Sequence, residues 1–220
     1  MTISVAIVAM DEEANIGRTL ASVRWADEIV LVDSGSRDRT CEIAQEHCAQ
    51  VTVEPWRGYV AQKQYAIDLC TKDWVLLLDA DEEVSPGLAE EIRAAIALQR
   101  DQPAQAVELL ASASPYERAH PEAVYLRGLA YLSLREGAEA AVEFEKILDH
   151  KGANWGSDWQ HPYWGQFYSL SYLGLARASA LVGDTAKSRK AFQDFLALWK
   201  DADPNVPILK RAKAEYAKLQ

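Results

Sequence analysis

The chain of 220 residues is long enough for one or two domains with a sizeable core. Hydrophobic residues make up 49% and charged residues 25%, a composition typical of a soluble globular protein. The net charge of -10 argues against nucleic acid or an anionic membrane surface as the main partner. No stretch approaches the roughly 18 apolar residues that a membrane span needs, so we expect no integral membrane segment.

The three cysteines, Cys41, Cys48 and Cys70, form no CxxC pair, so we expect free buried thiols in a reducing compartment. The start of the chain, MTISVAIVAM, reaches Asp11 without a basic leader, which predicts no signal peptide. Together these features favour a cytoplasmic protein.

The first part of the chain alternates short apolar runs with helical patterns. The runs rich in β-branched residues predict strands at 3–10, 28–33, 50–55 and 74–79. Apolar residues at helical spacing predict helices at 12–23, 36–47 and 59–70. Strands and helices that alternate in this way are typical of a parallel sheet. We therefore expect residues 1–85 to form a Rossmann-like α/β half-sheet.

The second part of the chain is predicted to be all α-helical. Ser85 is a good N-cap and Pro86 suits the first helical position, so a helix is expected from there to about Arg100. Only helical patterns broken by short turns follow. The charge balance also changes, from -9 in residues 1–100 to -1 in residues 101–220. We therefore expect a second domain at 86–220.

This second part contains an internal repeat with a period of 34 residues. PAQAVELL (103–110) aligns with GAEAAVEF (137–144), and a weaker third copy, in which Ser179 and Ser188 depart from the pattern, precedes a capping helix at 208–220. The pattern resembles the tetratricopeptide repeat, whose small and aromatic packing positions correspond here to Gly128, Tyr131, Ala140 and Phe144. A generic helical bundle is the alternative interpretation.

The repeats also resemble the arrays that follow some bacterial serine/threonine kinases, although no kinase HRD or DFG signature is present. Between the second and third copies, the stretch 149–169 carries six aromatic residues. They could fill the gap that an insertion opens in the helical stack, or stack on sugars or peptides. Packing is the more ordinary interpretation of such a stretch.

The sequence WVLLLDADEEVSPG (74–87) ends a buried-looking strand in a cluster of acids. Asp79 and Asp81 lie two positions apart, so they face the same side of a strand at its carboxyl end, where open α/β sheets bind ligands. Two carboxylates there form a hard oxygen site suited to Mg²⁺ or Mn²⁺, which can also hold a diphosphate. The alternative is a solvated acidic loop that leads into a helix N-terminus.

Asp33 occupies the matching position at the end of the second predicted strand. A Ser/Gly turn follows it and would give a ligand close access to the backbone. A carboxylate there can accept a hydrogen bond from a base or a ribose. Because no GxGxxG is present, the sequence argues against a nicotinamide or flavin dinucleotide site.

Four segments, VAMDEEANI, VDSGSRDRT, AQKQYAI and WVLLLDADEEV, resemble family 2 glycosyltransferases in order and spacing. The subset that builds bacterial lipopolysaccharide core and related glycans is the most similar. The resemblance implies a GT-A fold, a nucleotide-diphosphate sugar, most often a UDP-sugar, and a divalent metal held at a DxD motif.

The resemblance also implies roles for individual residues. Ala9 and Glu12 would line the nucleotide pocket, with Lys63 near it. Asp33 would bind the base, typically uracil. Asp79 would contact the ribose or sugar side and help with the metal, and Asp81 would carry the metal.

The resemblance covers only about residues 1–90. Asp11 and Gln64 stand where the family usually has Asn. The half that binds the acceptor and supplies the catalytic base has no counterpart, so the catalytic residue is unknown. The chain therefore combines a truncated GT-A half with helical repeats, an α/β plus all-α architecture.

Three hypotheses follow for function. The first is a metal-dependent glycosyltransferase-like protein that binds a nucleotide sugar and transfers the sugar, with inversion, to a glycan or lipid acceptor. The second is a scaffold that binds a protein through its repeats and carries a degenerate transferase remnant. The third is a fusion of a truncated transferase with a foreign repeat array, made by nature or in a laboratory. We also expect the repeats to dock on the sheet edge, or the chain to form a homodimer.

Overall fold

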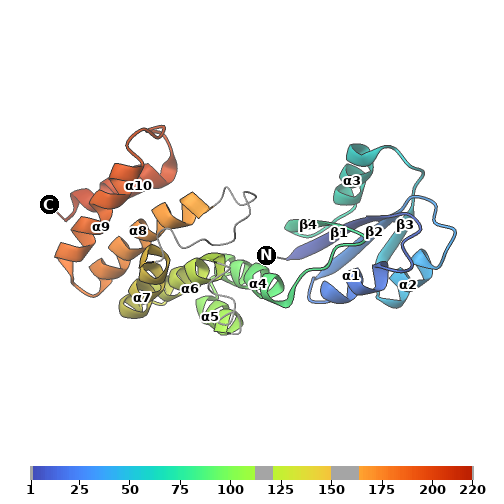
Figure 1. The fold of residues 1–220 in the computed structure, drawn as a ribbon, viewed down its shortest axis with the longest axis horizontal. Helices are drawn as coiled ribbons and strands as arrows, with labels where there is room; N and C mark the ends of the chain where they lie inside the picture. The colour runs from blue at the N-terminus through green and yellow to red at the C-terminus, as the bar shows by residue number, and fades with distance from the viewer. Residues whose placement is uncertain (1, 112–120, 150–163, 220) are drawn as a thin grey trace. The chain divides into compact units, whose positions relative to one another are not determined.

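The computed structural model describes residues 2–111, 121–149 and 164–219 (Figure 1). The chain divides into two compact units, Met1–Ala89 and Glu90–Gln220. Most of the aromatic stretch 149–169 lies outside the described residues. The nucleotide-sugar-binding and repeat roles predicted for the two parts stay predictions.

The first unit is built on a four-stranded sheet. Its strands are β1 (Ile3–Ala9), β2 (Glu28–Asp33), β3 (Gln50–Val53) and β4 (Trp74–Asp79), in the order β3-β2-β1-β4. Each pair is parallel, which confirms the parallel sheet predicted from the sequence. Ala9 lies opposite Asp33, and Val8 lies opposite Asp79. The carboxyl ends of three strands therefore meet at one edge of the sheet.

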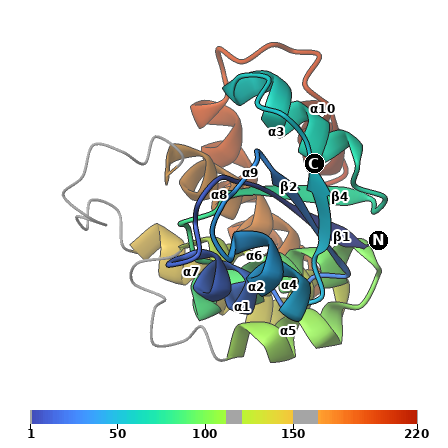
Figure 2. The same ribbon diagram turned by 90° about the vertical axis from the view of Figure 1, so that its right-hand side faces the viewer.

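Helices cover both faces of this sheet. They are α1 (Ile16–Ser22), α2 (Thr40–Glu46) and α3 (Tyr59–Asp68). Figure 1 and Figure 2 show α1 and α2 on one face and α3 on the other. Alternation along β1 explains this, because Val5 and Ile7 pack in the core with α1, whereas Ala6 packs with Ala66 of α3.

Two helices begin later than predicted, α1 at Ile16 rather than at residue 12 and α2 at Thr40 rather than at 36. The residues before them bind the neighbouring loop instead of joining a helix. The backbone N–H of Asp11 donates to Ser36 Oγ (2.8 Å), and that of Glu12 donates to Thr40 Oγ1 (2.8 Å). Asp11 also has a φ of 56°, a left-handed conformation that Asp and Asn tolerate better than most residues.

The cysteines differ in part from expectation. All three are free, as predicted, but only Cys41 and Cys70 are partly buried. Cys48 is exposed and adopts a φ of 61° just after α2, so the expectation of a buried thiol is wrong there.

The second unit is helical. Helix α4 (Pro86–Gln99) crosses the division between the units. It is followed by α5 (Pro103–Ala111), α6 (Pro121–Ser133), α7 (Gly137–Asp149), α8 (Trp164–Leu181), α9 (Thr185–Leu198) and α10 (Pro207–Ala217). From α5 onward each helix packs against the next in chain order. Among the described residues, none of the helices has the length and apolar character needed to cross a membrane.

The residues aligned by the 34-residue period occupy equivalent buried places. Ala106 and Leu110 of α5 and their counterparts Ala140 and Phe144 of α7 are all fully buried. A Cβ on Gly128 of α6 would lie 2.8 Å from two carbon atoms of the Phe144 ring, too close for a normal contact. The glycine thus allows the ring to pack directly against the backbone of α6.

Replacing Gly128 by Ala should lower the free energy of unfolding by about 1–3 kcal/mol, because the added methyl group overpacks the Phe144 ring. Urea denaturation followed by circular dichroism measures this. Gly87→Ala in α4 is the control, since its added Cβ meets nothing within 4 Å and should not destabilise the protein. Equal stability of Gly128→Ala and the parent would contradict the packing argument.

At the amino end of the sheet in the first unit, the buried carboxylate of Glu28 links β2 to β1 and to the segment that precedes β4. Glu28 accepts hydrogen bonds from the Thr71 N–H (2.8 Å), the Thr71 hydroxyl (2.8 Å) and the Ser4 hydroxyl (2.5 Å). Burial raises the pKa of Glu28, but the hydrogen bonds from Ser4 and Thr71 together lower it more, so the pKa lies below its ordinary value.

The lowered pKa predicts a pH effect on stability. A carboxyl group with a depressed folded-state pKa contributes stability that is present above its unfolded value, about 4.3, and is lost as the pH falls through the folded value. The free energy of unfolding should therefore fall more steeply below about pH 4.3 in the parent than in Glu28→Gln. Denaturant titrations at several pH values test this, with the exposed Glu46→Gln as the control. Identical pH profiles for Glu28→Gln and the parent would refute it.

Candidate functional site

A cavity of about 600 Å³ lies at the carboxyl edge of the sheet. It is lined by the ends of β1 and β4, by the segments that follow β1, β2 and β4, by the segment that leads into α3, and by α3 itself. Its residues are Val8, Ala9, Met10, Glu12, Ser34, Trp56, Tyr59, Lys63, Asp79, Ala80 and Asp81. Five of the six site residues expected from the sequence are therefore brought together: Ala9, Glu12, Lys63, Asp79 and Asp81.

Two residues that line the cavity form an ion pair with each other. Lys63 Nζ of α3 lies 2.6 Å from Asp79 Oδ1 at the end of β4. Both side chains are substantially exposed, so the pair contributes little to stability. Its consequence is electrostatic, because the positive charge of Lys63 offsets part of the negative charge of the acidic cluster beside the cavity.

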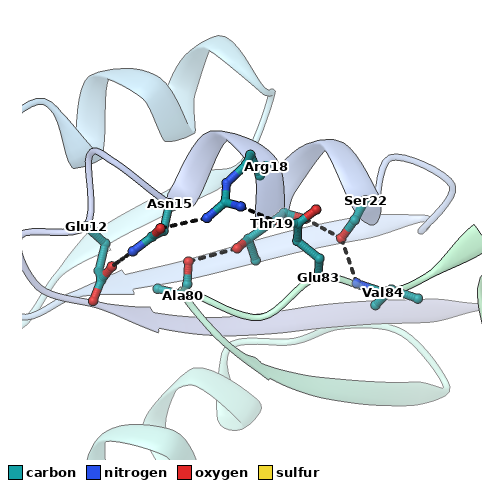
Figure 3. Close-up of polar contacts among 8 residues, drawn as sticks. All are labelled: Glu12, Asn15, Arg18, Thr19, Ser22, Ala80, Glu83 and Val84. Atoms are coloured by element: carbon teal, nitrogen blue, oxygen red, sulfur yellow. Dashed lines mark hydrogen bonds and ion pairs between the residues drawn. The ribbon is translucent and has the colours of Figure 1, made fainter.

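Helix α1 fixes the acidic segment that follows β4 (Figure 3). The buried Thr19 hydroxyl donates to the Ala80 carbonyl (2.8 Å), and the Val84 N–H donates to Ser22 Oγ (3.0 Å). Because these bonds hold the backbone at two points, the carboxylates between them project from a defined loop.

A chain of polar contacts connects Glu12 to the same segment. Glu12 Oε2 accepts from the Asn15 amide (2.8 Å), whose oxygen accepts from Arg18 (2.8 Å), as Figure 3 shows. Arg18 also pairs with Glu83 at 3.0 Å. The loops that follow β1 and β4 are therefore joined through α1.

The carboxylates of the cluster differ in what they contact. Asp79 pairs with Lys63, Glu82 accepts from the Asp79 N–H (3.0 Å), and Glu83 pairs with Arg18. Asp81 is exposed, and in the part of the chain that the structure describes its carboxylate has neither a hydrogen bond nor an ion pair. Asp81 is thus available to an added cation.

The donor set fits a hard divalent cation only in part. The carboxylates of Asp79 and Asp81 supply the oxygen ligands that Mg²⁺ and Mn²⁺ prefer. Within residues 2–111, 121–149 and 164–219, no group of three or more His, Cys, Asp or Glu side chains could hold a metal ion. A cation here would therefore take its other ligands from water or from a substrate.

Asp33 is the one expected site residue that is not among the cavity-lining residues. Its side chain is buried and accepts hydrogen bonds from the N–H groups of Gly35 (2.9 Å) and Ser36 (2.9 Å) and from the Ser36 hydroxyl. Gly35 has a φ of 102°, which a glycine adopts without strain. Asp33 therefore shapes the turn, while its neighbour Ser34 faces the cavity, and base binding by Asp33 stays a prediction.

Sequence reasoning missed several residues of the cavity wall, namely Met10, Ser34, Trp56 and Tyr59. Trp56 follows β3 much as Asp79 ends β4, and Tyr59 is the first residue of α3. The rule that ligands bind at the carboxyl ends of parallel strands could have found Trp56. Trp56 is easily overlooked as a site residue, because an aromatic residue near a strand usually belongs to the hydrophobic core.

Gln62 of α3 holds the segment that carries Trp56. It is fully buried, and its amide nitrogen donates to the Glu54 carbonyl (3.0 Å) and to Ser34 Oγ (3.2 Å). Its amide oxygen accepts from the Arg57 N–H (3.1 Å). One side chain therefore fixes the backbone on both sides of Trp56 and ties it to the end of β2.

Gln62→Leu should lower the free energy of unfolding by about 1–3 kcal/mol, because it leaves the buried Ser34 hydroxyl and the partly buried backbone groups of Glu54 and Arg57 without this partner. Gln64→Leu on the same helix is the matched control, since Gln64 is exposed and, among the described residues, its side chain bonds to Asp68 alone. Its effect should stay within about 0.5 kcal/mol. Equal stability of the two variants would mean that Gln62 does not hold the segment.

The sequence matches the family model for glycosyl transferase family 2 over residues 4–129, which is more than half of the 220-residue chain. An uncharacterized glycosyltransferase of Rickettsia felis is 48% identical over 91 residues, which cover 41% of this chain and 32% of the relative. The lipopolysaccharide core biosynthesis glycosyltransferase LpsC of Rhizobium meliloti is 38% identical over 95 residues, covering 41% of this chain and 35% of LpsC.

A third relative differs in kind. A TPR repeat-containing protein of Synechococcus elongatus is 40% identical over 103 residues, which cover 46% of this chain and 25% of that protein. In each case the matched region spans about a third or less of the relative's own length.

Proposed function

The chain belongs to glycosyl transferase family 2, and from this premise we propose that its first unit binds a nucleotide-diphosphate sugar, a UDP-sugar in the first instance. The observation that carries the proposal is the convergence of Ala9, Glu12, Lys63, Asp79 and Asp81 on one cavity. These residues come from three segments that are far apart in the sequence, and the parallel sheet and α3 bring them together.

Asp81 and Asp79 are the proposed ligands of a divalent cation, Mg²⁺ or Mn²⁺. The exposed carboxylate of Asp81, which has neither a hydrogen bond nor an ion pair among the described residues, supports this assignment. When bound, such a cation would neutralise charge on the diphosphate and make it a better leaving group. Asp79 and Asp81 alone leave coordination positions open for diphosphate oxygens and water.

Lys63 is proposed to bind the anionic end of the ligand. Lys63 lines the cavity, and its ammonium group already makes a contact of 2.6 Å with Asp79. A phosphate oxygen is a stronger acceptor for an ammonium group than water is, because both partners are charged. Lys63 would therefore orient the diphosphate beside the two aspartates.

Sugar transfer to a glycan or lipid acceptor is the reaction we propose for the protein to which this unit belongs. The acceptor oxygen would form a bond to the anomeric carbon, the bond to the diphosphate would break, and a base would take the hydroxyl proton. The name of LpsC supports a lipopolysaccharide-type acceptor. No residue of this chain is assigned as the base, because the match to the relatives covers about a third of their length.

A second proposal concerns the helical unit, which we propose to be a tetratricopeptide-like module that binds a protein. The buried, equivalent positions of Ala106 and Ala140 and of Leu110 and Phe144, at a spacing of 34 residues, support it. The named repeat-containing relative from Synechococcus elongatus adds support. This unit could serve the protein whether or not the first unit catalyses transfer.

Calorimetric titration of UDP and UDP-sugars, with and without Mn²⁺, tests the first proposal. We expect Mn²⁺-dependent binding to the parent and at least a tenfold loss of affinity in Asp81→Asn, since the amide no longer supplies a charged ligand. Glu82→Gln is the matched control, because it removes a neighbouring charge yet keeps an oxygen that can accept the Asp79 N–H.

Glu82→Gln should bind as the parent does. Absence of any nucleotide binding to the parent would overturn the proposal. Equal affinity of the parent and Asp81→Asn would overturn the assignment of the cation ligand.

A further inference from the structure

Two exposed aromatic side chains stand together in the wall of the cavity. The ring centroids of Trp56 and Tyr59 are 4.9 Å apart, and both residues line the cavity. Trp56 is 48% exposed and Tyr59 is 78% exposed. A single exposed aromatic residue is ordinary, but two in contact within a cavity leave a large apolar surface in water that a ligand could cover.

The geometry of the pair leaves ring faces free. The two ring planes are inclined at 88°, so the edge of one ring meets the face of the other. In this arrangement each ring keeps at least one face that its partner does not cover. Aromatic faces bind other flat rings in offset or edge-on contacts, so the pair can receive a third planar ring.

The segment that carries Trp56 is held in place before any ligand arrives. Gln62 bonds to the backbone of Glu54 and Arg57, as described above. Arg57 also pairs with Glu54 at 2.6 Å and lies over the ring of Tyr65, 4.5 Å from its centroid. Little conformational entropy is therefore lost from this segment when a ligand binds, which favours affinity.

The aromatic pair and the acids line the same cavity and are connected through α3. Tyr59 and Lys63 are four residues apart on α3, which places them on the same face about one turn apart. Lys63 in turn contacts Asp79. A nucleoside diphosphate carries a flat base at one end and phosphates at the other, so it offers a partner to the aromatic rings and a partner to Lys63.

We propose that Trp56 and Tyr59 stack on the nucleobase of the bound nucleotide sugar, an inference that rests on the function proposed above. The base is held by aromatic faces, while the diphosphate lies toward Lys63, Asp79 and Asp81. Asp33 is buried and shapes the turn after β2 through the hydrogen bonds that it accepts from Gly35 and Ser36.

The test separates the base from the phosphates. UDP and pyrophosphate, each with Mn²⁺, are titrated into the full chain and into Trp56→Ala and Tyr59→Ala. Loss of a stacking partner should weaken UDP binding about five- to hundredfold and leave pyrophosphate binding unchanged, because pyrophosphate has no base. Trp74→Ala is the control, since Trp74 is also exposed but does not line the cavity, and it should change neither affinity.

A second measurement keeps the test decisive where pyrophosphate binds too weakly to measure. UDP should quench tryptophan fluorescence in the parent, and this quenching should fall in Trp56→Phe while UDP affinity is largely retained, because a flat ring remains. Circular dichroism of each variant checks that the fold is intact.

The outcomes are distinct. UDP affinity that is unchanged in both alanine variants, quenching that persists in Trp56→Phe, or equal weakening of UDP and pyrophosphate binding would each overturn the stacking proposal alone. A parent protein that binds no nucleotide would instead overturn the proposed function, and the stacking proposal with it.

Discussion

The parallel pairing of β1 with β2 and β4 is the constraint on which the candidate site depends. Parallel strands bring their carboxyl ends to one edge of the sheet, and the register places Ala9 beside Asp33 and Val8 beside Asp79. A shift of one residue would turn every side chain of a strand to the opposite face. Core residues such as Ile7, which fill the space beneath α1, therefore also determine where the acids lie.

The loops at this edge are held mainly by hydrogen bonds to each other, and less by the helices that follow them. Backbone groups of 11–13 donate to side chains of 36–40. Because these groups bond between the two loops, the first predicted turns of α1 and α2 are not helical. The same principle explains Asp33 and Gln62, whose polar groups are satisfied inside the molecule by loop backbone.

Much of this could be predicted from the sequence, and the reasons for the exceptions are physical. Strand positions and the cluster at Asp79 and Asp81 follow from local patterns, because hydrophobic alternation and strand-end position are local properties. The late start of α1 and the inward turn of Asp33 depend on partners about 25 residues away or on turn geometry. The role of Gln62 requires three partners from two other segments, which no single-sequence pattern reveals.

The network through which α1 holds the acidic segment has a consequence for how affinity can change. Thr19 and Ser22 fix the backbone at Ala80 and Val84, so the conformational entropy of this loop is lost during folding rather than on binding. Substitutions on the far side of α1 that loosen this helix would then weaken ligand binding, although they change no residue of the cavity. Variation in affinity among natural relatives need not be sought only in the residues that contact the ligand.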